Sequence, residues 1–184
     1  MNTEEIYSIL MAHELTAKHM GSVCASDQLP PTRGLLEKDQ YFIVNLDPSH
    51  LPGSHWVACY MRKNPLEPNV FFDSYGFPPM IPKLCAFVGE NTIYNENCLQ
   101  HPESTACGQW CILFVWHQIL GHDINCLASR FTHENHLRND WEVTHFINRI
   151  FNTKLKALDL PFVKKQNARS RKENQMVLDI YNAV

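Results

Sequence analysis

The stretch that decides the fold is Thr105-Ala106-Cys107-Gly108-Gln109-Trp110-Cys111-Ile112-Leu113-Phe114-Val115-Trp116-His117-Gln118-Ile119-Leu120-Gly121. From Trp110 onward it is almost entirely apolar and lacks proline, a pattern that predicts a buried helix ending at Gly121. Cys107 falls in the first turn, where unpaired N–H groups and the positive end of the helix dipole favour thiolate. Because thiolate is the nucleophilic form, Cys107 is a candidate nucleophile, and we expect its thiol to be exposed and its pKa to be lowered. A buried, unreactive cysteine is the alternative interpretation.

Length and composition indicate a globular protein. The chain has 184 residues, of which 45% are hydrophobic and 19% charged, and its formal net charge is −3. This balance excludes an overall electrostatic attraction for nucleic acid or anionic membranes. The chain has no run of about 18 apolar residues that would predict a membrane-spanning helix. Residues 1–14 lack the pattern of a signal peptide. We therefore expect no membrane partner.

The seven cysteines are odd in number and have no regular spacing. A complete disulfide framework would leave one of them unpaired. We therefore expect free thiols in an intracellular, reducing compartment.

The order of helix and strand patterns predicts an α+β fold. Short runs of β-forming residues predict strands at 41–46, 56–61, 69–72 and, at a sheet edge, 92–94. The second and third of these strands form a hairpin. Helical patterns are found at 3–19, 81–88 and 140–151, in addition to the helix that ends at Gly121. Thr3 and Asp140 are the expected N-caps, and prolines and a glycine predict a loop at 23–36.

The hairpin places two polar residues where they can serve Cys107. His55 precedes the strand 56–61, and Asp73 follows the strand 69–72. Because the start of one hairpin strand lies beside the end of its partner, we expect the two side chains to be neighbours. A carboxylate can then orient an imidazole whose other nitrogen faces a thiol. Gln100, in the polar loop before the helix, can donate to an oxyanion together with the Cys107 N–H. Each of these residues taken alone is more typical of an ordinary loop or turn.

These residues also carry a resemblance to a family. His55-Trp56, Phe72-Asp73-Ser74-Tyr75-Gly76-Phe77, Gln100 and Ser104-Thr105-Ala106-Cys107-Gly108 resemble motifs of the adenain group of cysteine proteases. This group comprises the adenovirus maturation protease and its relatives in other DNA viruses and virus-like transposons. The order His, acidic residue, Gln, Cys is also that of the ubiquitin-like-protein proteases of the same clan. The resemblance covers residues 40–120. A weaker pattern resembles a substrate-side loop of these relatives, and it consists of Gly21, Asp27, Leu29 and Pro30.

The resemblance implies a papain-like cysteine protease architecture. In it, a central mixed sheet is flanked by helices, and the nucleophile stands at the N-terminus of a buried central helix. The adenain-like domain would span residues 1–163, followed by a basic C-terminal tail at 164–184.

The implied activity is that of a cysteine endopeptidase that processes viral precursor proteins during particle maturation, with a preference for small residues such as glycine. A viral enzyme of this kind would act in the host nucleus and virion, and we expect a monomer. Cys107 is then the nucleophile, His55 the general base, Asp73 its orienting partner and Gln100 an oxyanion donor. The expected substrate-binding residues are Trp56, Gly53, Ser54 and Gly108. The alternatives are a protease for a ubiquitin-like modifier and an inactive scaffold or nucleic-acid-binding relative.

Metal and DNA are the other ligands to weigh. Candidate zinc ligands are Cys107, Cys111, His117 and His122, with His133 and His136 further along. The first four follow one another along the same predicted helix, whereas zinc sites usually gather ligands from two elements. The sequence therefore requires no metal or cofactor. Adenain-like enzymes can use an activating peptide or DNA. Phosphate contacts could come from Lys164, Lys165, Arg169, Arg171 and Lys172, for which a solvated basic tail is the alternative.

Overall fold

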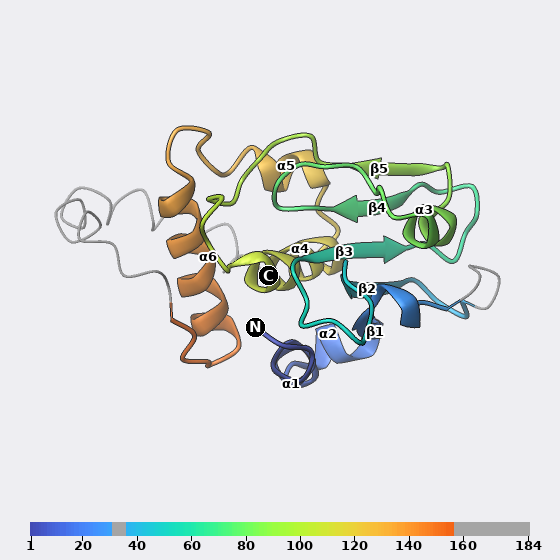
Figure 1. Ribbon diagram of the computed structural model, residues 1–184, viewed down its shortest axis with the longest axis horizontal. Helices are drawn as coiled ribbons and strands as arrows, with labels where there is room; N and C mark the ends of the chain where they lie inside the picture. Colours follow the sequence, from blue (N-terminus) through green and yellow to red (C-terminus); the bar gives the residue numbers. More distant parts are fainter. Residues whose placement is uncertain (31–35, 157–184) are drawn as a thin grey trace, which may run out of the picture.

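The computed structural model describes residues 1–30 and 36–156, which fold around a five-stranded mixed sheet (Figure 1). The strands lie in chain order: β1 (Met20–Ala25), β2 (Gln40–Asn45), β3 (Trp56–Met61), β4 (Asn69–Phe72) and β5 (Thr92–Tyr94). β2, β3 and β4 are antiparallel, and each outer strand pairs parallel with its neighbour. The predicted α+β fold and the hairpin of β3 and β4 are confirmed.

Helices cover both faces of the sheet. The helical elements are α1 (Thr3–Met11), α2 (Glu14–His19), the 3-10 turn η1 (Ser26–Gln28), α3 (Pro82–Val88), α4 (Cys107–Ile119), α5 (Ile124–Ala128) and α6 (His136–Ile150). Successive strand residues point to opposite faces, so Ile43 packs with α4, whereas Val44 packs with α3. Burial on both faces explains why the strands read as continuous apolar runs.

Helix α4 is the centre of the larger core. Every residue from Cys107 to Gln118 is buried. The helix lies along one face of the sheet, where Phe114 stacks on Phe72 of β4 with ring centroids 5.0 Å apart. Gly121, whose φ is +79°, follows the helix in the left-handed conformation that glycine adopts readily. The predicted buried helix and its end at Gly121 are therefore confirmed.

The N-terminal region differs from the prediction. Residues 3–19 form two helices rather than one, and the N-cap of α1 is Asn2, not Thr3. Asn2 exchanges hydrogen bonds with Glu5 in a capping box, which satisfies two N–H groups and so outcompetes Thr3. Part of the predicted loop at 23–36 belongs to β1. The parallel pairing with β2 makes these residues a strand. The two strands approach closely at Gly21, where an added Cβ would lie 2.5 Å from the ring of Phe42.

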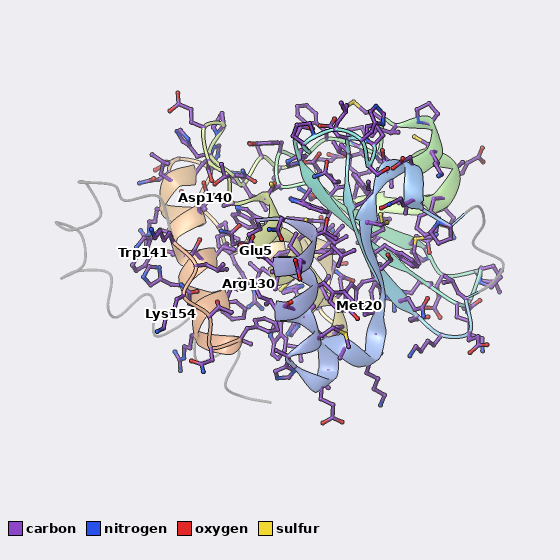
Figure 2. All side chains as sticks on the ribbon, turned by 60° about the horizontal axis from the view of Figure 1, so that its bottom comes forward. Glu5, Met20, Arg130, Asp140, Trp141 and Lys154 are labelled. Carbon is purple, nitrogen blue, oxygen red and sulfur yellow. The ribbon has the colours of Figure 1, made fainter. Side chains whose placement is uncertain are left out.

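The C-terminal region also differs. The last described helix, α6, begins at His136 rather than Asp140, and its N-cap is Asn135, whose side chain accepts a hydrogen bond from Arg138 N. Asp140 is buried within the helix because it bonds to α4, whereas Trp141 lies on the outer side of α6 (Figure 2). The predicted domain end at 163 and the tail 164–184, with its basic residues, lie outside the described residues.

No helix in the part of the chain that the structure describes is long and apolar enough to cross a membrane.

Candidate active site

The structure brings His55 and Asp73 together at one end of the β3–β4 hairpin. β3 and β4 pair antiparallel, so His55, just before β3, lies beside Asp73, just after β4. The Nε2 atom of His55 is 2.9 Å from Oδ1 of Asp73. Because Nε2 is engaged by the carboxylate, Nδ1 is the nitrogen left for another partner. The hairpin therefore provides the oriented imidazole that the sequence predicted.

Several hydrogen bonds from neighbouring residues hold Asp73 in place. Its side chain is buried, and its Oδ1 also accepts a hydrogen bond from the backbone N–H of Tyr75 at 2.8 Å. The buried amide of Asn95 bonds the Asp73 backbone twice, since Oδ1 accepts from Asp73 N at 3.1 Å and Nδ2 donates to Asp73 O at 2.7 Å. These bonds fix the carboxylate in position. Nothing in the sequence around Asn95 predicted this role, because it requires the fold.

Cys107 is the third member of the arrangement. It begins α4 and is 9% exposed, which makes it less accessible than the exposed thiol we expected. Burial alone would raise its pKa, but hydrogen bonds from His55 and from the N–H groups of Trp56 and Gly108, with the charge of His55, lower it overall. The thiolate form is therefore favoured despite burial.

The pKa of His55 moves in the opposite direction. Burial would lower it, but hydrogen bonds to Asp73 and Cys107 and the charges of both groups outweigh burial and raise the pKa to about 9. The raised pKa of the imidazole and the lowered pKa of the thiol together favour a thiolate–imidazolium pair near neutral pH. Such a pair has a nucleophile and a proton donor ready at the same place.

Gln100 lies behind the pocket rather than in it. Its side chain is fully buried, and its Oε1 accepts a hydrogen bond from Ser74 Oγ at 2.7 Å. Its Nε2 donates to Ser104 O at 2.8 Å and to the hydroxyl of Tyr75 at 3.2 Å. The residue that the sequence predicted as an oxyanion donor is therefore linked to the pocket through Tyr75 and Ser104, which both line it. The sequence could not show the bonds to Ser74 and Tyr75, since these two residues come from a different loop.

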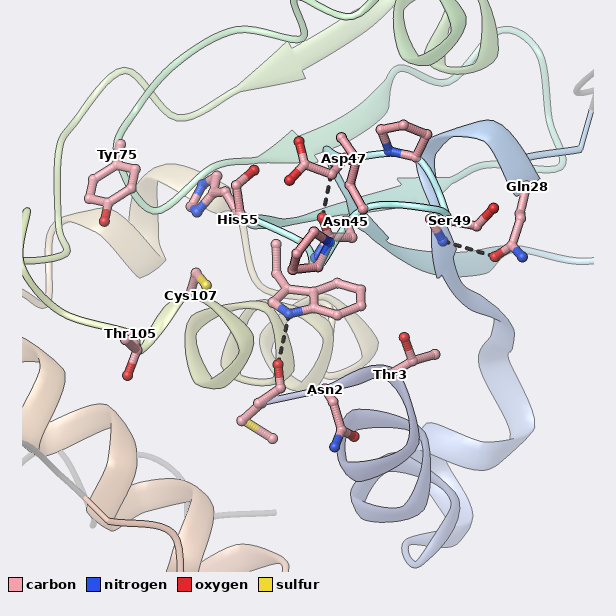
Figure 3. A pocket seen from close by; sticks show the side chains of 18 of the residues that line it. Asn2, Thr3, Gln28, Asn45, Asp47, Ser49, His55, Tyr75, Thr105 and Cys107 are labelled. Carbon is pink, nitrogen blue, oxygen red and sulfur yellow. Dashed lines mark hydrogen bonds between the residues drawn. The ribbon is translucent and has the colours of Figure 1, made fainter.

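A pocket of about 590 Å³ opens beside Cys107 and His55 (Figure 3). Its walls come from residues 1–3, from residues between 45 and 56, and from the segment that leads into α4. Three of the four expected substrate-binding residues line it, namely Gly53, Ser54 and Trp56. The indole N–H of Trp56 donates to the carbonyl of Met1 at 3.0 Å. Gly108 is not among the lining residues; it is buried against Met1 instead.

The second, weaker motif braces a more distant wall of this pocket. The carboxylate of Asp27, in η1, accepts hydrogen bonds from both the backbone N–H and the hydroxyl of Ser49, each at 2.8 Å. Ser49 lines the pocket, as does the neighbouring Gln28. Asp27 therefore ties η1 to the loop between β2 and β3, which also carries His55.

The candidate metal ligands do not gather at one point. Cys107 and Cys111 lie in the first half of α4, and His117 lies near its end with its ring 4.7 Å from that of His122. Among residues 1–30 and 36–156, no group of three His, Cys, Asp or Glu side chains is arranged to hold a metal ion. Within this part of the chain, we assign no metal site.

Comparison with known proteins adds no family assignment. No protein-family model matches the chain, and a search of curated proteins gives no match either. Function is therefore inferred from the residues of the site.

Proposed function

We propose that this protein is a cysteine endopeptidase in which Cys107 is the nucleophile and His55 and Asp73 activate it. The observation that carries the proposal is the position of His55, which bonds Asp73 through Nε2 at 2.9 Å and lines the same pocket as Cys107. The lowered pKa of Cys107 and the raised pKa of His55 support an ion pair of this kind. A histidine and a cysteine with a purely structural role would not be expected to line a pocket, whereas His55 and Cys107 both do.

The reaction follows from these positions. The Sγ thiolate of Cys107 bonds to the carbonyl carbon of a peptide, and the electron pair of the C=O bond moves to oxygen. The backbone N–H of Cys107, at the start of α4, is available to this oxyanion because helices leave their first N–H groups without intrahelical partners. The His55 imidazolium gives its proton to the leaving amine as the C–N bond breaks. The neutral imidazole then takes a proton from water, which attacks the thioester and releases the acid and the thiolate.

The shape of the site supports a polypeptide substrate. The pocket extends from Cys107 to Gln28, so it leads away from the candidate nucleophile, and both polar and apolar side chains line it (Figure 3). We propose that the architecture is papain-like, since the candidate nucleophile opens a buried helix packed on the sheet. The resemblance to adenain motifs supports viral or virus-like precursor proteins as the substrates.

Turnover of a library of fluorescence-quenched peptides tests this proposal. The parent protein should cleave a subset of peptides, and Cys107→Ala should cleave none while retaining the fold by circular dichroism. Cys111→Ala, one turn along the same helix, serves as the matched control and should keep turnover in its folded fraction. A parent that leaves all peptides intact, or an alanine variant as fast as the parent, would contradict the proposal. Ubiquitin-like fusion proteins in a parallel assay distinguish the modifier-processing alternative.

A further inference from the structure

The hydrogen bonds of Gln100 leave no donor for a substrate. A glutamine amide has two N–H donors, and those of Gln100 go to Ser104 O at 2.8 Å and to Tyr75 Oη at 3.2 Å. The side chain is fully buried and does not line the pocket. Both acceptors belong to residues that line the pocket, but only the hydroxyl of Tyr75 has a proton that it can donate onward.

Tyr75 is rigidly placed beside the reacting groups. Its backbone N–H donates to the Asp73 carboxylate at 2.8 Å, and its ring stacks on that of His55 with centroids 4.8 Å apart and planes at 27°. The side chain is half-buried and lines the same pocket as Cys107. Figure 3 shows Tyr75, His55 and Cys107 around one end of this pocket.

The hydroxyl of Tyr75 has a proton to offer. Its oxygen accepts from Gln100, so its own O–H is directed elsewhere, and it donates to Pro102 O at 3.4 Å. That distance is far longer than the usual 2.7–2.8 Å of an O–H···O bond, so the proton is weakly held and can turn to a better acceptor. Burial raises the pKa of Tyr75, which keeps the phenol protonated at neutral pH.

We propose that Tyr75 is a catalytic residue whose hydroxyl donates to the oxyanion formed on Cys107, with Gln100 acting behind it. This inference rests on the proposed function. Gln100 donates to the phenol oxygen and so makes its O–H a stronger donor, because hydrogen bonds in a chain polarise one another. No covalent bond of Tyr75 is made or broken. As Sγ bonds to the carbonyl carbon, the C=O electron pair moves to oxygen, and the O–H of Tyr75 turns from Pro102 to that charge.

The test compares two reactions of the same thiolate. N-acetyl-Gly-Gly p-nitrophenyl ester acylates Cys107 through a tetrahedral oxyanion and expels p-nitrophenolate. Iodoacetamide alkylates Cys107 by displacing iodide, without any oxyanion. Tyr75→Phe keeps the ring on His55 and removes only the hydroxyl. It should slow the p-nitrophenolate burst by about 10²- to 10³-fold, the scale of one oxyanion donor. The rate constant of alkylation should stay within twofold of that of the parent, and the pH profile of alkylation should be unchanged.

Two matched variants control this comparison. Tyr7→Phe removes the hydroxyl of an exposed tyrosine on α1 and should change neither rate. Tyr75→Leu also removes the ring from His55 and should slow acylation at least as much as Tyr75→Phe.

The outcomes separate this inference from the proposed function. An acylation rate of Tyr75→Phe equal to or above that of the parent would return the donor role to Gln100 and overturn the inference alone. Equal slowing of acylation and alkylation would also overturn it, because a merely structural tyrosine acts on both. A burst that survives in Cys107→Ala would overturn the proposed function, and the inference with it.

Discussion

At His55, burial competes with two charged neighbours for control of the proton. Burial disfavours the imidazolium, while Asp73 and Cys107 favour it, and the neighbours prevail with a pKa raised to about 9. At Cys107 the hydrogen bonds and charge likewise overcome burial and lower the pKa. Each residue alone would be an ordinary buried group. The reactive state belongs to the pair.

The pH dependence of kcat/KM follows from these directions. Activity requires Cys107 as thiolate and His55 as imidazolium, so it should rise as pH passes the lowered pKa of Cys107 and fall as pH passes about 9. Asp73→Asn removes the charge that supports the imidazolium and should move the alkaline limb to lower pH. Stopped-flow turnover across this range measures both limbs. A parent profile that still rises above pH 9 would contradict the ion pair.

The residue types at the site and the pairing of His55 with Asp73 were predictable, but the hydrogen bonds of Gln100 were not. The positions of His55 and Asp73 follow from hairpin geometry, and that of Cys107 follows from the start of an apolar helix. The bonds of Gln100 to Ser74 and Tyr75 join loops that are far apart in sequence. No local pattern encodes such a network, because the pairing depends on how β4 and the loop before α4 meet.

Among the elements, α6 illustrates how tertiary contacts set the use of a residue. Asp140 has the side chain of a typical N-cap, but it lies within α6 and accepts from the indole N–H of Trp110 at 2.7 Å and from His101 N at 3.1 Å. It thereby joins α4 to the loop that carries Gln100. Local sequence predicted the helix itself, and its start at His136 follows from the Asn135 cap, whereas strand β1 depends on its pairing with β2.

Removing the Asp140 carboxylate should weaken this junction. Asp140→Ala leaves the buried indole N–H of Trp110 and the partly buried N–H of His101 without this acceptor, at about 1–3 kcal/mol for the buried group. Urea unfolding should therefore give a clear loss in the free energy of unfolding. Glu142→Ala, on the same helix, breaks a partly exposed ion pair with Arg138 and should lose about 1 kcal/mol at most. Equal losses in the two variants would contradict the proposed junction.

For the molecule as a whole, the core carries a titratable group that does not take part in the proposed chemistry. The side chain of His117 is fully buried on α4, and neither ring nitrogen has a hydrogen-bond partner among the described residues. Burial, with the charges of His122 and Arg130, lowers its pKa to about 3. The folded protein therefore keeps His117 neutral under conditions in which an unfolded chain would protonate it.

Acid should destabilise the fold through this residue. Below the ordinary histidine pKa of 6.5, His117 binds a proton in the unfolded chain, whereas in the folded chain it stays neutral down to about pH 3. The stability that neutral His117 contributes is complete above 6.5 and is lost as pH falls, at up to about 1.4 kcal/mol per pH unit. His117→Leu should flatten the slope in urea unfolding, whereas His50→Leu, at an exposed position, should not. An unchanged slope in His117→Leu would show that the acid sensitivity arises elsewhere.

The central claim is that the fold makes one of seven cysteines a nucleophile, and the order of alkylation tests it most directly. Burial raises the pKa of Cys24, Cys59 and Cys111, whereas that of Cys107 is lowered. The intact chain is treated with limiting iodoacetamide near neutral pH, and peptide mass spectrometry locates the label as turnover is followed. We expect Cys107 to be labelled first, with activity lost in proportion. Faster labelling of Cys111, or full activity after Cys107 is labelled, would contradict the claim.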